Sequence, residues 1–133
     1  MMANSSLIKK LRLQAGQKAL ILNPPARYID DLGRLPEDVQ LSLEPGGKFD
    51  FVHLFAIQSS ELTRIKTIAV ESVEFDGLLW ISYPKRSSKI DSDLSRDDMW
   101  ELYIDERLRP VSQISIDETW SAVRFRPAEK VGK

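Results

Sequence analysis

Apolar residues come in short runs along the chain, and the spacing within these runs alternates between two patterns. Residues 18–22 and 49–56 are almost continuously apolar, which is typical of strands buried on both faces of a sheet. Between residues 59 and 73 the apolar positions recur near helical spacing, which indicates an amphipathic helix. The pattern predicts strands at 18–22, 39–43, 49–56, 78–83, 111–116 and 120–125, and helices at 7–11, 26–32, 59–73 and from Ser95 to Ile104.

The order of these elements predicts the fold class. Helices alternate with apolar strands, and the last two strands are joined tightly by residues 117–119. This order is typical of an α/β domain with a mixed sheet of about six strands, mostly parallel and closed by an antiparallel hairpin. The length of 133 residues fits a single domain over 1–133, in which we expect residues 127–133 to form a frayed tail.

One connection in this scheme is unusually short. Only residues 45–48 separate Glu44, at the end of the second strand, from Phe49, and they span at most about 18 Å. Parallel neighbours in a sheet need a crossover of about a dozen residues or more. The strands at 39–43 and 49–56 therefore form either an antiparallel hairpin or a parallel pair joined by a taut diagonal link.

Composition excludes several kinds of chemistry. Without cysteine the chain has no disulfides, no thiolate nucleophile and no Cys-ligated metal site. A net charge of −1 gives no overall field that would attract nucleic acid or an anionic membrane. With no cysteine and no leader or membrane-spanning pattern, we expect a cytoplasmic protein.

The single histidine, His53, is the only candidate for an imidazole base. It falls in the middle of a predicted strand, between Val52 and Leu54, whereas ligands of open α/β sheets bind beyond the strand ends. We therefore expect a buried, hydrogen-bonded histidine with a structural role.

Four segments resemble the S-adenosylmethionine-dependent methyltransferases. Residues 14–22 are similar to the entry to their first strand, 48–55 to their fourth, 75–84 to their fifth and 108–125 to their closing hairpin. The resemblance implies a reduced Rossmann/methyltransferase-like three-layer fold, since the short 45–48 link leaves no room for the family's third strand and its helix. It also implies S-adenosylmethionine as a possible cofactor.

The cofactor fingerprint is only half present. The glycine-rich loop that should follow the first strand is replaced by Asn23-Pro24-Pro25, and prolines lack the N–H groups of a backbone cradle. Glu44 stands 21 residues after Asn23, where an acidic residue would hold the ribose hydroxyls. Asn23-Pro24-Pro25 also resembles the Asn-Pro-Pro-Tyr motif of adenine-N6 methyltransferases, although Tyr28 comes three residues later and we favour a strand stop followed by a helix start.

A second resemblance covers nearly the whole chain. Residues 79–88 and 116–121 are similar to a family of small bacterial proteins with no established activity. This similarity supports the fold and brings no chemistry with it.

The loop after the fifth predicted strand is the best local candidate for a site. It carries three cations and two hydroxyls at a strand carboxyl end, so it could bind the phosphate or carboxylate of a small anionic ligand; the alternative is a solvated surface loop. Together with the fingerprint positions, the candidate cofactor-binding residues are Asn23, Glu44, Tyr83, Lys85, Arg86, Ser87 and Ser88.

Charges near the C-terminus suggest a weaker alternative. Arg107, Arg109, Arg124 and Arg126 flank the last two strands and could meet RNA or an acidic protein, or guard the sheet edge against aggregation.

Two functions remain open from the sequence. The first is a non-catalytic interaction or small-ligand-sensing module on a degenerate methyltransferase-like scaffold, with an unidentified protein partner or small ligand, no catalytic residues and no metal. The alternative is an S-adenosylmethionine- or nucleotide-dependent enzyme or binder with a crevice at the strand carboxyl ends.

Overall fold

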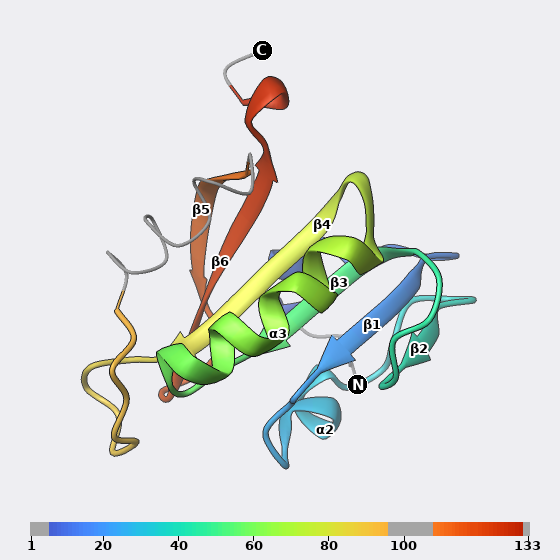
Figure 1. Cartoon of the computed structure of the whole chain (residues 1–133). Coiled ribbons are helices and arrows are strands. Elements are labelled where there is room, and N and C mark those ends of the chain that lie inside the picture. The colour runs from blue at the N-terminus through green and yellow to red at the C-terminus, as the bar shows by residue number, and fades with distance from the viewer. Residues whose placement is uncertain (1–5, 96–107, 132–133) are drawn as a thin grey trace.

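The computed structural model describes residues 6–95 and 108–131, which contain a six-stranded sheet (Figure 1). The strand order is β2-β1-β3-β4-β6-β5. Strands β1 to β4 are parallel, and β6 is antiparallel to both of its neighbours, β4 and β5. The predicted α/β class and mixed sheet with an antiparallel terminal hairpin are therefore confirmed. The elements are α1 (Ser6–Leu11), β1 (Lys18–Leu22), α2 (Tyr28–Leu32), β2 (Gln40–Ser42), β3 (Phe49–Phe55), α3 (Ser59–Ser72), β4 (Val73–Pro84), β5 (Leu108–Ser115), β6 (Trp120–Pro127) and the 3₁₀ turn η2 (Ala128–Lys130).

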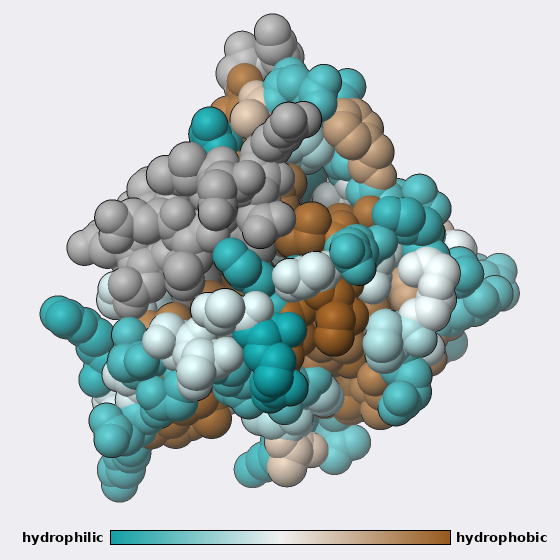
Figure 2. Space-filling view, viewed as in Figure 1, coloured by the Kyte–Doolittle hydropathy of each residue, from teal (hydrophilic) through white to brown (hydrophobic). Residues whose placement is uncertain are grey.

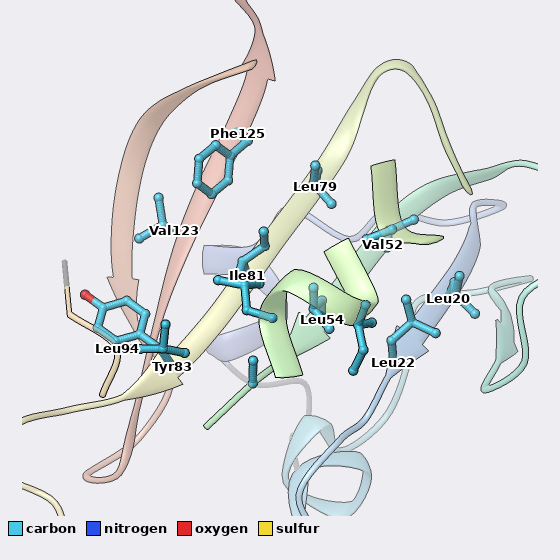
Figure 3. Packing of buried hydrophobic residues seen from close by; sticks show 14 of the residues in the cluster. Leu20, Leu22, Val52, Leu54, Leu79, Ile81, Tyr83, Leu94, Val123 and Phe125 are labelled. Atoms are coloured by element: carbon cyan, nitrogen blue, oxygen red, sulfur yellow. The ribbon is translucent and has the colours of Figure 1, made fainter. Parts of the chain in front are cut away.

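Helices cover both faces of the sheet, which gives the three predicted layers. Alternate residues of a strand point to opposite faces, so each central strand supplies two apolar surfaces. On one face α3 packs over a cluster that includes Leu20, Val52 and Ile81, and Figure 3 shows these side chains between the helix and the sheet. On the other face α1 and α2 pack over a second cluster that includes Phe51 and Trp80. Hydrophobic surface also reaches solvent over α3 in Figure 2, surrounded by hydrophilic residues.

The connection from α3 to β4 differs from its prediction. The pair Asp76-Gly77 predicts the end of the helical unit and a strand from residue 78, whereas β4 begins directly after α3 at Val73. Its pairing with β3 is interrupted by residues 74–77, because Phe49 pairs with Val73 and Phe51 pairs with Leu78. Within this bulge Asp76 has a φ of 58°, and this left-handed backbone is the turn signal that the sequence carries.

The taut diagonal link, and not the hairpin, joins the second and third strands. Both β2 and β3 run parallel to β1 and lie on opposite sides of it. The crossover can be short because β2 has only three residues and ends level with Leu20, so residues 43–48 return only a short way along the strands.

The C-terminal residues contain regular structure that the sequence does not predict. Within the tail expected to be frayed at 127–133, β6 continues to Pro127 and η2 spans Ala128–Lys130. The helix predicted from Ser95 falls almost entirely on residues 96–107, outside the described part of the chain. Among the described residues, no helix is long and apolar enough to cross a membrane.

Candidate ligand-binding site

The carboxyl ends of the parallel strands define the edge at which open α/β sheets place ligands. In Figure 1 the arrowheads of β1, β3 and β4 point toward this common edge. The strand order reverses between β1 and β3, since β1 connects onward to β2 on one side while β3 lies on the other. A ligand crevice is expected at such a switch point.

Asn23 spans the switch point. It follows β1 with a φ of 58°, a left-handed conformation that asparagine tolerates better than most residues. Its side-chain Nδ2 donates to the backbone oxygen of Phe55 over 3.0 Å and to Oε2 of Glu61 over 2.8 Å. The other carboxylate oxygen of Glu61 accepts from the backbone N–H of Ile57 over 2.7 Å. One side chain therefore connects the end of β1, the end of β3 and the first turn of α3.

The acidic half of the fingerprint lies away from this bridge. Glu44 is exposed two residues beyond the end of β2, on the opposite side of β1 from the Asn23 contacts with β3. Asn23 and Glu44 thus follow two neighbouring parallel strands, β1 and β2, while the hydrogen bonds of Asn23 run to the other side of β1, toward β3 and α3.

The predicted basic loop folds back on the terminal hairpin. Tyr83 is buried, and its hydroxyl accepts from the side chain of Gln113 over 3.0 Å. Lys85 donates from Nζ to the Ser115 hydroxyl and from its backbone N–H to Thr119, each over 2.7 Å. The Ser88 hydroxyl closes the turn by donating to the Lys85 carbonyl over 2.7 Å. Arg86 and Ser87 are exposed, so of the predicted loop residues these two present their side chains most fully to solvent.

The segment after this loop occupies the start of α3. Asp93 accepts from the backbone N–H of Ser59 over 2.6 Å and from its hydroxyl over 2.8 Å. The hydrogen bond from the Ser59 hydroxyl, followed by that from its N–H, holds the pKa of Asp93 below its usual value. The N–H group of Ser59, the first residue of α3, therefore already donates to a carboxylate of the protein.

A cavity of about 570 Å³ lies beside the carboxyl ends of β1 and β3, on the face that α2 covers. Its floor is a group of buried rings. Phe55 meets Trp120 at a centroid distance of 5.2 Å and Tyr28 at 4.6 Å, both in edge-to-face geometry. The other lining residues of the cavity are apolar side chains, which form its walls, and charged or polar side chains, which form its rim. The apolar ones are Pro25, Ala26, Ile90 and Ile116, and the polar ones are Arg27, Asp31, Asp117, Glu118 and Thr119. The volume is within the range of small-molecule sites.

The sequence does not predict this cavity, although two of its segments carry separate signals. Residues 23–28 resemble a degenerate cofactor loop, and residues 117–121 predict a polar turn with Trp120 at the start of a packed strand. Trp120 is indeed buried at the first position of β6. Only the pairing of β6 with β4 brings that turn beside the loop after β1, and no local pattern encodes this contact.

Beneath the floor, His53 is fully buried and hydrogen-bonded on both sides, as expected. Its Nδ1 lies 2.6 Å from the Tyr28 hydroxyl and its Nε2 lies 2.6 Å from the Ser82 hydroxyl. Burial lowers the pKa of His53 to about 3 and raises the pKa of Tyr28, so both groups are neutral at pH 7. Ser82 has no solvent access, so this constellation positions the Tyr28 ring under the cavity and offers no accessible nucleophile.

Comparisons with known proteins identify the architecture. No family model matches the chain, and no curated protein matches it. Among solved structures, the N-methyltransferase NodS from Bradyrhizobium japonicum WM9 aligns over 92% of this chain and 94% of its own, with 14% identity and a TM-score of 0.56. A complex of DhpI with SAH aligns over 92% and 82%, with 11% identity and a TM-score of 0.62. A ribosomal protein L11 methylase from Lactobacillus delbrueckii subsp. bulgaricus aligns over 92% and 75%, with 10% identity and a TM-score of 0.60. The chain has a methyltransferase-like fold.

This likeness extends to the Rossmann-like sheet and its layers, and identities of 10–14% support nothing beyond the fold. In the methyltransferase-like sheet described here β2 is an edge strand, in agreement with the expected loss of a third strand unit. Among the described residues, no group of three or more histidines and carboxylates is placed to hold a metal ion.

The Asn23 bridge leads to a first prediction. Asn23→Ala should lower the free energy of unfolding by about 1.5 kcal/mol, because it removes two hydrogen bonds. It also leaves an alanine in a left-handed backbone conformation, which crowding of its β-carbon disfavours. Asn23→Gly loses the same two hydrogen bonds, but glycine adopts the left-handed conformation without strain. The glycine variant should therefore be about 1 kcal/mol more stable than the alanine variant. Urea unfolding measures both, and an alanine variant as stable as the parent chain would show that the bridge contributes nothing.

Proposed function

We propose that this chain is a non-catalytic ligand-sensing module on a methyltransferase-like scaffold, with its ligand in the cavity between the β1–α2 loop and the β5–β6 turn. The observation that carries the proposal is the Asn23 bridge. A cofactor at the switch point needs backbone N–H groups close to it, and here that place holds an asparagine side chain bonded to β3 and α3, followed by two prolines.

The chemistry of the cavity supports binding over catalysis. Its described lining contains no histidine, serine or lysine, and its carboxylates stand at the rim. The one histidine of the chain lies below the floor with both nitrogens engaged. Acid–base catalysis needs a group within hydrogen-bond reach of the substrate, which His53 does not offer.

The alternative function is an S-adenosylmethionine- or nucleotide-dependent binder or enzyme. NodS has been solved in complex with S-adenosyl-L-homocysteine, and DhpI with SAH, which supports a related ligand for this scaffold. In that case Glu44 would hold the ribose, while Arg86 and Ser87 would be the exposed contacts of the loop after β4.

Calorimetry with S-adenosylmethionine, S-adenosyl-L-homocysteine and ATP, each at millimolar concentration, separates the two functions. We expect no saturable heat from any of them. Saturable heat that disappears in Glu44→Gln, and persists in the exposed control Glu37→Gln, would establish the alternative.

A positive result for the proposed site comes from a fragment library screened by NMR. Binding fragments should shift the indole N–H resonance of Trp120 and the backbone resonances of residues 25–28. Fragments that shift only residues around Glu44 would contradict the assignment of the ligand to this cavity.

A further inference from the structure

At the end of the sheet opposite the proposed ligand cavity, an aromatic side chain projects into solvent beside a second cavity. We infer that this surface binds a second copy of the chain, with Phe75 of each copy seated in the cavity of the other. The surface, called here the bulge surface, consists of this cavity, Phe75 and the charged side chains of Lys48, Glu74, Glu129 and Lys130 around them. The inference does not depend on the proposed function, because the ligand cavity lies at the carboxyl ends of β1 and β3, whereas the bulge surface lies at the start of β4 (Figure 1).

A bulge at the start of β4 turns Phe75 outward. Residues 74–77 interrupt the pairing with β3, and within them Asp76 has a φ of 58°. The Asp76 carboxylate accepts two hydrogen bonds from Arg126, at 2.9 and 2.8 Å, and a β-carbon on Gly77 would lie 3.0 Å from two backbone oxygens. The bulge is therefore held firmly in a conformation that leaves Phe75 65% exposed, more than any other large apolar side chain that the structure describes. Bulges commonly re-aim a side chain in this way.

The cavity beside Phe75 has a volume of about 310 Å³ and lies on the face of the sheet that α3 covers. Buried side chains of Leu79 and Phe125, both labelled in Figure 3, form its base. Val70 in the last turn of α3 and Leu108 at the start of β5 form its walls. Benzene enters an engineered apolar cavity of about 150 Å³, so there is room here for a phenyl ring. The bulge surface thus carries both an exposed ring and a recess that fits one.

A ring and a recess side by side suit a two-fold interface between identical chains. In such an interface the same patch serves both copies, so each copy offers the ring and receives it. Aromatic side chains that fill a pocket of the partner typically contribute most of the binding energy of an interface. The partner that the bulge surface fits is therefore the chain itself.

The charges around the ring and the recess are also self-complementary. They comprise two lysines, Lys48 and Lys130, and two glutamates, Glu74 and Glu129. Neither glutamate forms an ion pair within the described part of the chain. A two-fold axis through the bulge surface places the lysines of one copy against the glutamates of the other. Because the whole chain has a net charge of −1, two copies approach each other with little repulsion.

Sedimentation velocity of the full chain from about 1 to about 100 µM tests the inference. The sedimenting mass should approach twice 15.2 kDa at the upper end. Phe75→Ser should raise the dimer dissociation constant at least about tenfold, as the loss of an aromatic anchor does, while Phe75→Trp should keep the dimer. The control is Leu43→Ser, which removes another exposed apolar side chain, 54% exposed and next to β2, and should leave the dissociation constant unchanged.

Two charge variants test whether like surfaces meet. Glu74→Lys with Glu129→Lys makes the bulge surface wholly basic, and Lys48→Glu with Lys130→Glu makes it wholly acidic. Each double variant alone should dimerise at least about tenfold more weakly than the parent, and an equal mixture of the two should restore the dimer.

Three results would overturn the inference. The first is a chain that stays monomeric throughout the concentration range, which would also be the outcome if another part of this chain or a different protein covered the bulge surface. The second is a dimer that Phe75→Ser weakens no more than Leu43→Ser does. The third is a pair of charge variants that each dimerise as tightly as the parent.

Discussion

His53→Leu is expected to lower the free energy of unfolding by about 4 kcal/mol. The substitution leaves the hydroxyls of Tyr28 and Ser82 in a dry core without the imidazole that lies 2.6 Å from each of them. A buried polar group without its partner costs roughly 1–3 kcal/mol, and the substitution leaves two such groups, the hydroxyls of Tyr28 and Ser82. The loss of the stacked contact with Phe55, at a centroid distance of 4.2 Å, adds to it. Urea unfolding followed by far-UV circular dichroism measures the change.

A triple variant separates the polar network from simple packing. Combining His53→Leu with Tyr28→Phe and Ser82→Ala removes all three polar groups together, so we expect it to be more stable than His53→Leu alone. Replacing both partners of a buried hydrogen bond is far less costly than removing one. If the three substitutions instead add up independently, the side chains do not act as a network.

Acid should destabilise the protein through the same histidine. The pKa of His53 is about 3 in the folded chain, while an unfolded chain has a value near 6.5. Between these values the unfolded state binds a proton that the native state does not, so stability falls as the pH falls. The slope is about 1.4 kcal/mol per pH unit, which amounts to a loss of about 2 kcal/mol between pH 7 and pH 5. Unfolding curves at half-unit intervals of pH measure it.

His53→Gln provides the control for this pH dependence. The lowered pKa values of Asp76 and Asp93 also make the native state less stable in acid, but they act below the ordinary range of a carboxyl, outside the interval from pH 7 to pH 5. The slope in that interval should therefore vanish in His53→Gln. If the glutamine variant keeps the full slope, another group is responsible.

The sequence predicted the central layers well because their signals are local. Continuous apolar runs marked β1 and β3, and helical spacing marked α3, each within a few residues of its observed bounds. The start of β4 was missed because Asp76-Gly77 carries a strong turn signal, and the turn is a bulge within the strand rather than its beginning. Residues 126 and 127 look irregular in the sequence because a proline and polar residues follow Phe125, whereas the β5–β6 pairing continues through Arg126 to Pro127.

The candidate site was less predictable because its contacts join distant segments. The sequence singles out Asn23 only because it stands where a glycine-rich cofactor loop is expected. Its bridge to Phe55 and Glu61 depends on β1, β3 and α3 meeting at one edge of the sheet. One signal for the buried network is present in the sequence, since His53 and Ser82 interrupt the apolar stretches 51–56 and 78–83 of two adjacent strands. Two buried polar side chains on neighbouring strands can hydrogen-bond to each other, so that neither is left without a partner in the core. The contribution of Tyr28 could not be foreseen, because it follows from the packing of α2.

The six-residue link between β2 and β3 also governs how the edge of the sheet behaves. β2 pairs through three residues and on one side only, so it is the strand most easily detached. Once detached, it stays within about 20 Å of its docking position, because the link can extend no further. Loops of this length close in roughly 10–100 ns, so the edge returns before a second chain can pair with it at ordinary concentrations. A short crossover thereby gives this sheet kinetic protection at an edge that has no covering helix after it in the chain.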